Sequence, residues 1–176
     1  DTMRAPPELY VFGSGNDVQP VTEVAGKLDF RVTVVAFRGA RADPDAFPHA
    51  DRVVAAGAPR VADKLELDDR SYAVLMSHNI VDDRMALESL LETDVPYVGL
   101  MGPTERFEEI RDALAADGRD LTDADLDRIY APIGVDLGGG APYQIATSIA
   151  TEVLAVHNGR DPGHLRDRKS PIHARR

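Results

Sequence analysis

The sequence has no cysteine among its 176 residues and very little lysine. The lack of cysteine excludes disulfides, thiolate metal ligands and cysteine nucleophiles. Lys27, Lys64 and Lys169 are the only lysines. No apolar run approaches the ~18 residues that a membrane-spanning helix needs, and no signal peptide precedes the first predicted strand. We therefore expect a cytoplasmic protein without a membrane partner.

Several common catalytic patterns are also missing. No tyrosine is followed four positions later by lysine, so the Tyr/Lys pair of many dehydrogenases is absent. No Gly-x-Ser-x-Gly elbow occurs, and no His, Asp and Glu residues cluster with zinc-ligand spacing. The sequence therefore predicts no metal site, assigns no catalytic residue, and does not support a classical oxidoreductase.

The charge is strongly one-sided. Thirty acidic residues, mostly aspartate, against twenty basic residues, mostly arginine, give a formal net charge of −10 at pH 7. A surface rich in Asp and poor in Lys suits a salt-rich cytoplasm, where repulsion between carboxylates is screened. We therefore predict a halophilic protein; an ordinary acidic protein is the alternative. The negative charge disfavours nucleic acid as a partner.

The carboxyl-terminal segment has the opposite charge. Residues 160–176 carry six Lys and Arg against two Asp, a formal charge of +4, which leaves −14 for residues 1–159. The helix-stop pair Asn158-Gly159 precedes this segment. We predict one domain over residues 1–159 and a partly ordered basic extension over 160–176. Alternatively, the extension is a strap that docks on an acidic partner or on the domain itself.

Apolar runs of strand length alternate with stretches of helical periodicity. The predicted strands are 9–12, 31–37, 52–55, 71–76 and 97–100. The predicted helices are 17–28, 82–92, 103–118, 122–129 and 142–159, the fourth of them starting with a capping box at Thr122 and Asp125. This alternation predicts an α/β fold, a Rossmann-like doubly wound and mostly parallel sheet with helices on both faces. Ligands of such sheets bind at the carboxyl ends of the strands.

The first of these carboxyl ends carries a glycine turn. Gly13-Ser14-Gly15 follows a strand and precedes a helix, as the dinucleotide-binding fingerprint requires. However, Val18 replaces the third glycine, and Asp17 lies where a pyrophosphate would approach. The backbone N–H groups of the turn can still hold a phosphate. The alternative is a tight turn in which Asn16 or Asp17 caps the helix.

The next candidate follows the second predicted strand. An NAD-binding domain has an acidic residue there, roughly 20 residues after the glycines, to bind the ribose. Here Ala36 cannot accept such a hydrogen bond. Arg38 can contact a phosphate, which favours an NADP-like or more anionic ligand; alternatively, it pairs with a neighbouring aspartate.

Two further sites lie at the same predicted edge. Ser77 and His78 follow the fourth strand, and histidine titrates near neutral pH. The alternative is that His78 caps the next helix or bonds to the backbone. Asp136 precedes Gly138-Gly139-Gly140, where the backbone can approach a ligand or a neighbouring subunit closely.

These segments, in this order, resemble the carboxyl-terminal Rossmann domain of the XdhC/CoxI family, the xanthine dehydrogenase accessory proteins. The resemblance covers residues 9–160. The residues that carry it are VFGSGNDVQP (11–20), FPHAD (47–51), VLMSH (74–78), PYVGLMG (96–102), APIGVDLG (131–138) and a closing helix at 152–160.

The resemblance implies a role in the maturation of molybdenum hydroxylases. Members of the family are held to bind molybdenum cofactor (molybdopterin), to protect it, and to pass it to the apo-enzyme. The binding residues that it implies by position are Gly13, Ser14, Gly15, Asn16, His78 and Asp136. With Asp17, Arg38 and Ser77 from the residue analysis, these make up the predicted cofactor site.

The sequence departs from the family pattern at three points. The family usually has histidine at the position of Asn16 and aspartate at that of Ala36. It also has a separate amino-terminal domain that is missing from this sequence; either the sequence is a fragment of a longer protein, or it is a stand-alone version that needs a partner for that part. Two alternatives stay open: an NAD(P)-dependent oxidoreductase, and a non-catalytic homodimeric interaction module with a vestigial nucleotide pocket.

Overall fold

The computed structural model describes residues 5–169 and contains one six-stranded sheet. The strand order is β3-β2-β1-β4-β5-β6, and every ladder is parallel. The strands are β1 (Glu8–Phe12), β2 (Arg31–Ala36), β3 (Arg52–Ala55), β4 (Ser71–Leu75), β5 (Tyr97–Leu100) and β6 (Ile129–Tyr130). This order confirms the predicted Rossmann-like, doubly wound fold.

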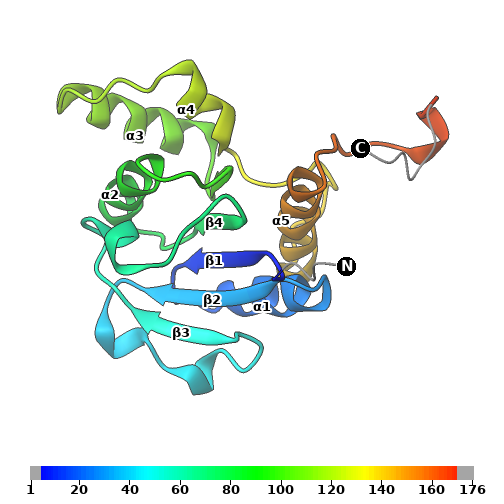
Figure 1. Ribbon diagram of the computed structural model, residues 1–176, viewed down its shortest axis with the longest axis horizontal. Helices are drawn as coiled ribbons and strands as arrows, with labels where there is room; N and C mark the ends of the chain where they lie inside the picture. The colour runs from blue at the N-terminus through cyan, green and yellow to red at the C-terminus, as the bar shows by residue number, and fades with distance from the viewer. Residues whose placement is uncertain (1–4, 170–176) are drawn as a thin grey trace.

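Helices cover both faces of the sheet (Figure 1). One face is covered by α1 (Val18–Lys27) and α5 (Pro142–His157), and the other by α2 (Ile80–Leu91) and α3 (Thr104–Ala116). Successive side chains of a strand point to opposite faces. In β1, Tyr10 and Phe12 therefore pack with α2 and α3, whereas Leu9 and Val11 pack with α1 and α5. All four are fully buried, so the sheet is a rigid support for the loops at its edges.

The starts of two helices agree with the sequence prediction, whereas the end of one of them differs. α1 begins directly after Asp17, as the position of Pro20 predicts, because proline is tolerated only in the first turn. The capping box of Thr122 and Asp125 is present at the start of α4 (Asp123–Arg128). The prediction that this helix continues through Ile129 is wrong. Ile129 instead pairs with Val98 of β5, where the β-branched side chain packs on the sheet.

The topological switch point lies between β1 and β4. The chain runs outward from β1 to β2 and β3, then crosses back to pair β4 with β1. Consequently the β1–α1 turn and the β4–α2 loop lie side by side. A Cβ atom on Gly13 would be only 2.6 Å from the carbonyl oxygen of Met76.

Beyond α5 the chain leaves the domain. Residues 160–162 still line a surface hollow with Tyr130 and Glu152, and the chain then runs outward to a short 3-10 turn, Leu165–Asp167 (Figure 1). The rest of the predicted extension, 170–176, lies outside the described residues. Within residues 5–169, no helix combines the length and the apolar character that crossing a membrane requires.

Candidate anion-binding site

The β1–α1 turn presents backbone N–H groups at the switch point. The Gly13 N–H donates to the Val35 carbonyl at 3.0 Å, and the Val18 N–H donates to the Gly15 carbonyl at 3.1 Å. Across the described part of the chain, the N–H groups of Ser14, Gly15 and Asn16 have no hydrogen-bond acceptor. Three successive unpaired amides beside the positive end of a helix can bind an anion.

Asp17 lies beside these amides but does not cap the helix. It occupies the N-cap position of α1, yet its side chain accepts no hydrogen bond from the helix. Instead, Asp17 Oδ2 is 2.5 Å from His78 Nε2 in the β4–α2 loop. The other oxygen, Oδ1, is 2.8 Å from the point where a Cβ atom on Gly15 would lie. Neither alternative for a capping side chain at Asn16 or Asp17 is therefore correct, because the Asp17 carboxylate lies across the turn.

His78 is held in an uncommon backbone conformation. Its φ is 63°, in the left-handed region, which costs a β-carbon-bearing residue about 1 kcal/mol. Its neighbours on both sides are fixed. Ser77 Oγ donates to Asp83 Oδ1 at 2.6 Å, and Asn79 Oδ1 accepts the Val81 and Asp82 N–H groups of α2, each at 3.1 Å. Asn79, rather than His78, therefore caps α2, and the His78 ring is left to bind Asp17.

The buried carboxylate of Asp83 fixes the β4–α2 loop through its hydrogen bond with Ser77. Asp83 is 1% exposed and also accepts a hydrogen bond from Arg106 of α3 at 3.1 Å. Burial raises the pKa of Asp83, although the bonds from Ser77 and Arg106 oppose the shift. The sequence placed Asp83 in a helix but gave no sign that α3 would bury it. Only the tertiary fold makes Asp83 the anchor of Ser77.

Arg38 pairs with a neighbouring aspartate, which is the second of the two roles predicted for it. Its guanidinium lies 3.0 Å from Asp82 in the first turn of α2, and its side chain is 62% exposed. Ala36, the last residue of β2, provides no acceptor for a ribose. Arg41 is exposed in the turn that follows. This edge therefore lacks the ribose clamp of an NAD-binding domain, and its nearest arginine is already paired.

The structure does not join Asp136 to the residues of the glycine turn or of the β4–α2 loop. Asp136 is exposed in the loop before α5, and within the described chain it forms no hydrogen bond or ion pair. The loop itself is fixed at Gly134, whose N–H donates to Glu152 at 3.0 Å. The three glycines that follow line a shallow surface hollow with Tyr143 and Gln144 of α5.

Glu152 has a role that the sequence did not reveal. Its Oε1 atom accepts a second hydrogen bond, at 2.8 Å, from the hydroxyl of Tyr97, which is fully buried in β5. Burial, with the Glu152 charge, raises the pKa of Tyr97 well above its ordinary value. Glu152 therefore ties α5 to both β5 and the loop that carries Asp136.

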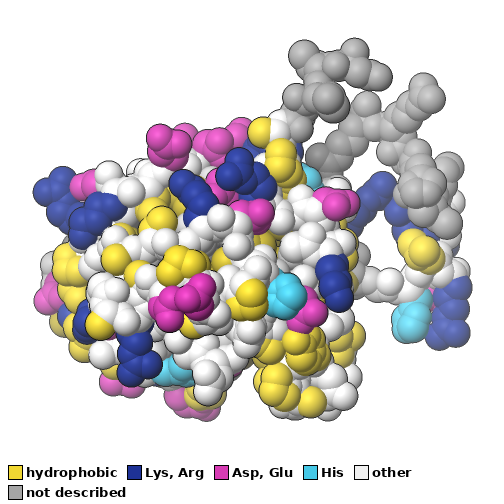
Figure 2. Space-filling view, turned by 90° about the horizontal axis from the view of Figure 1, so that it is seen from below, with side chains coloured by type: hydrophobic (Ala, Val, Ile, Leu, Met, Phe, Trp, Pro, Cys, Tyr) yellow, Lys and Arg dark blue, Asp and Glu magenta, His cyan; other side chains and the backbone are white. Residues whose placement is uncertain are grey.

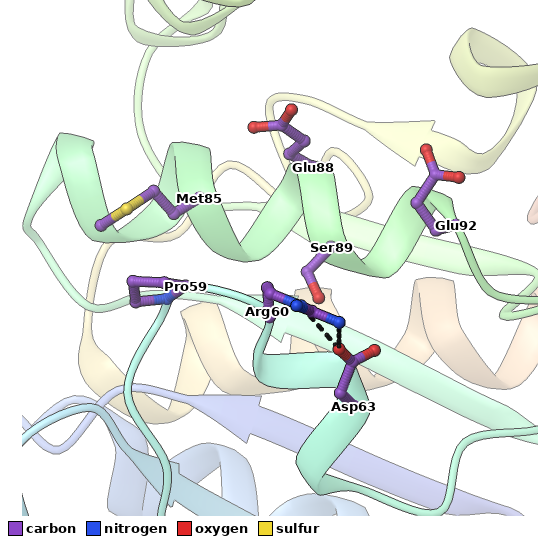
Figure 3. A pocket seen from close by; sticks show the side chains of 7 residues that line it. All are labelled: Pro59, Arg60, Asp63, Met85, Glu88, Ser89 and Glu92. Atoms are coloured by element: carbon purple, nitrogen blue, oxygen red, sulfur yellow. Dashed lines mark hydrogen bonds and ion pairs between the residues drawn. The ribbon is translucent and has the colours of Figure 1, made fainter.

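A separate surface hollow lies between α2 and the 3-10 turn Val61–Lys64 (Figure 3). Arg60 pairs with Asp63 at 2.8 Å on one side, and the Glu88 and Glu92 side chains point away from that pair. The charged groups do not converge on the hollow, and it does not include the glycine turn. Among residues 5–169, no three His, Asp or Glu side chains are placed to hold a metal ion.

Comparison with known proteins identifies the family of this chain. Residues 9–153 match the family described as XdhC Rossmann domain. The chain belongs to that family. This XdhC domain is 25% identical over 148 residues to a protein of Bacillus subtilis (strain 168) named as a probable xanthine dehydrogenase subunit. The overlap covers 84% of this chain and 42% of that protein.

A second relative and two solved structures extend the comparison. The domain is 26% identical over 160 residues to "Uncharacterized protein YqeB" of Escherichia coli (strain K12), covering 90% of this chain and 29% of that protein. A crystal structure of a xanthine dehydrogenase from Bacillus halodurans superposes with a TM-score of 0.76 at 25% identity, over 88% of this chain and 45% of that one.

Apo saccharopine dehydrogenase from Saccharomyces cerevisiae shares the fold alone. It superposes with a TM-score of 0.51 at 20% identity, over 75% of this chain and 28% of that chain. The XdhC domain spans less than half the length of the relatives it matches.

Proposed function

We propose that this XdhC domain is part of an accessory factor that matures molybdenum hydroxylases of the xanthine dehydrogenase type. Its role is to bind molybdenum cofactor, or a related phosphate-bearing nucleotide, rather than to turn over a substrate. The family match over residues 9–153 supports the accessory role, as does the Bacillus subtilis relative, whose name links it to xanthine dehydrogenase.

The observation that carries the binding proposal is the row of unpaired amides at Ser14, Gly15 and Asn16. Molybdopterin ends in a phosphate, or in a nucleotide in its dinucleotide form. Either group carries the negative charge that backbone N–H groups and the amino end of α1 attract. The pterin ring would then lie toward the β4–α2 loop, where Ser77 and His78 offer polar contacts.

The proposal includes a protein partner. This partner is the apo-form of a molybdenum hydroxylase, which receives the cofactor. The XdhC domain covers 42% of one relative and 29% of the other, so the remainder of those relatives is not represented in residues 1–176. A role of this kind would place the domain in the cytoplasm.

Calorimetric titration with four ligands tests the binding proposal: molybdopterin, CTP, NAD and NADP. We expect molybdopterin to bind more tightly than NAD or NADP. Ser14→Asp adds a negative charge at the amides and should weaken molybdopterin binding by about 5-fold or more. Gly163→Asp adds the same charge in the carboxyl-terminal segment, where the space around the residue is open, and should have no effect.

The other outcomes each contradict the proposal. Tighter binding of NAD or NADP, with hydride transfer to a carbonyl compound, would indicate an oxidoreductase. Failure to bind any of the four ligands would indicate an interaction module with a vestigial pocket.

A further inference from the structure

The loop before α5 and the first turns of that helix form an exposed surface without charge. Residues 137–151 contain no Asp, Glu, Lys or Arg, although these residues make up 28% of the chain, and no other stretch of the sequence is as long without one. Burial does not explain this, because residues 137–145 and Thr147 are all exposed. We call residues 137–145 with Thr147 the uncharged surface.

Large apolar side chains gather on this surface. Within residues 5–169 five such side chains are exposed, and three of them, Leu137, Tyr143 and Ile145, belong to the uncharged surface. Leu137 and Tyr143 are 56% and 53% exposed, and both line a hollow with the glycines at 138–140. A Cβ atom on Gly140 would meet nothing within 4 Å, so the hollow is open there. Exposed apolar side chains that gather beside polar ones are typical of a protein–protein contact.

The uncharged surface is held in place by hydrogen bonds within the domain. The Tyr143 hydroxyl donates a hydrogen bond to Glu23 of α1, which fixes the position of the ring. The Gln144 side chain accepts the Ala141 N–H at 3.2 Å, and Thr147 Oγ1 donates to the Tyr143 carbonyl at 2.7 Å. A surface that is already ordered loses little conformational entropy when a partner binds.

The charge distribution restricts where two copies of this chain can meet. Each copy carries a formal charge of −10, so the copies repel one another. Contact through α3 would set like charges together, because that helix has four acidic residues against two arginines. The charges beside the uncharged surface are Asp136, which precedes it, and Glu23, which pairs with Lys27 at 3.5 Å. Two copies can therefore approach through this surface without opposing carboxylates at the centre of the contact.

The shape of the uncharged surface also suits a contact between identical surfaces. Such a contact must be complementary to itself, so that each copy supplies both a protruding group and the place that receives it. Here the exposed side chains of Leu137 and Tyr143 and the hollow at 138–140 belong to one surface. The centres of protein interfaces are depleted in charged residues and enriched in tyrosine, as this surface is.

We propose that the uncharged surface is the contact surface of a homodimer, and that its occupant is the same surface of a second copy of this chain. Leu137 and Tyr143 of each copy lie against the glycines at 138–140 of the other. The proposal goes beyond the proposed function, because it does not depend on which ligand the glycine turn binds.

Sedimentation equilibrium of the chain over a range of protein concentrations tests the proposal. We expect a monomer–dimer equilibrium. Raising KCl from about 0.2 M to about 2 M should tighten the dimer by about 3-fold or more, because salt screens the repulsion between two acidic copies. A contact between the basic carboxyl-terminal segment and the acidic helices of another copy would instead weaken. Circular dichroism at each salt concentration shows whether the protein is folded.

Two substitutions with matched controls locate the contact. Leu137→Ser should weaken the dimer by about 10-fold or more. Leu165→Ser removes a leucine of similar exposure, 59%, from the carboxyl-terminal segment and should have no effect. Thr147→Glu places two carboxylates within the contact and should also weaken the dimer by about 10-fold or more. Ala115→Glu adds the same charge at an exposed position of α3 and should change it by less than about 2-fold.

The proposal is overturned if the folded protein is a monomer at every concentration, if the dimer weakens in KCl, or if either Leu137→Ser or Thr147→Glu leaves it intact. It is also overturned if a molybdenum hydroxylase binds the monomer and Leu137→Ser abolishes that binding, because a different partner would then occupy the surface. Molybdopterin binding is measured separately by titration, so failure of the dimer and failure of the proposed function are distinguishable.

Discussion

The two glycines of the β1–α1 turn meet different neighbours. Gly13 has a φ of 152° and lies against the backbone of Met76, so a side chain there must displace the backbone directly after β4. Gly15 lies against the carboxylate of Asp17, which can rotate away. The Gly-x-Gly pattern is thus accounted for by the packing of the turn on the next strand and by the Asp17–His78 pair.

Gly13→Ala should therefore lower the free energy of unfolding by about 2–3 kcal/mol, through backbone strain and overlap with the Met76 carbonyl. Gly39→Ala is the matched control, because a Cβ there meets nothing within 4 Å. We expect that control to change stability by less than about 0.5 kcal/mol. Urea denaturation of both variants at fixed salt measures the difference, and equal effects would contradict the contact geometry.

Asp83 makes stability depend on pH in acid solution. Because burial raises its pKa above the ordinary 3.8, the folded protein holds this proton more tightly than the unfolded chain does. The contribution of Asp83 to the free energy of unfolding should therefore decline as the pH rises from about 3.8 through the raised value.

Asp83→Asn should remove that decline, and Asp69→Asn, at an exposed position, should retain it. Unfolding curves across this pH range compare the two slopes. A slope unchanged in Asp83→Asn would show that the carboxyl is not desolvated in the folded protein.

At the scale of elements, one carboxylate of α5 joins this helix to β5 and to the loop before it. Glu152 accepts hydrogen bonds from the buried Tyr97 hydroxyl and from the Gly134 N–H. Glu152→Ala should cost about 2–4 kcal/mol, because both donors lose their partner. Glu152→Gln keeps an acceptor oxygen and should cost less. Chemical denaturation distinguishes them, and equal losses would mean that side-chain packing rather than hydrogen bonding holds α5.

The carboxyl end of α5 carries a second pH-dependent contact. His157 Nδ1 lies 2.8 Å from the Tyr72 hydroxyl, and burial, with a smaller effect of Arg70, lowers the pKa of His157 from 6.5. The folded protein therefore takes up this proton less readily than the unfolded chain, so stability should be lost as the pH falls below about 6.5.

His157→Gln should reduce this loss, whereas His49→Gln should not. Midpoints of thermal unfolding, measured above and below about pH 6.5, give the comparison. The same acid sensitivity in the His157 variant would assign the effect to another group.

Most elements of the fold were predictable because their signals are local. Strand-length runs such as residues 97–100 and the capping box at Thr122 depend on neighbours in sequence, and the structure has both. β6 was missed because two residues carry no periodicity and their pairing depends on the edge of β5.

The sequence predicted where the site residues lie along the sheet edge, but it did not predict which residues they contact. Asp17 and His78 were expected at one edge, but their bond joins residues that are 61 positions apart. The burial of Asp83 and the bond between Glu152 and Tyr97 likewise depend on which helix covers which strand. Sequence patterns identify the polar groups at an edge, whereas their partners are fixed only by tertiary packing.

At the scale of the whole molecule, the acid excess predicts salt dependence. The net charge is −10, and acidic side chains are scattered over the face shown in Figure 2 rather than gathered in one place. Screening of their repulsion should raise the midpoint of thermal unfolding by about 5 °C or more between dilute buffer and molar KCl. Sucrose, which does not screen charge, is the control. Full stability in dilute buffer would contradict a halophilic adaptation.

The central claim is that the unpaired amides after β1 hold the phosphate end of molybdopterin. The most direct measurement is a nuclear magnetic resonance titration of the isotopically labelled protein with molybdopterin, following the amide signals of Ser14, Gly15 and Asn16. The account predicts saturable shifts of these signals that Ser14→Asp weakens and Gly163→Asp leaves intact. Binding of molybdopterin without a change at these amides would contradict it.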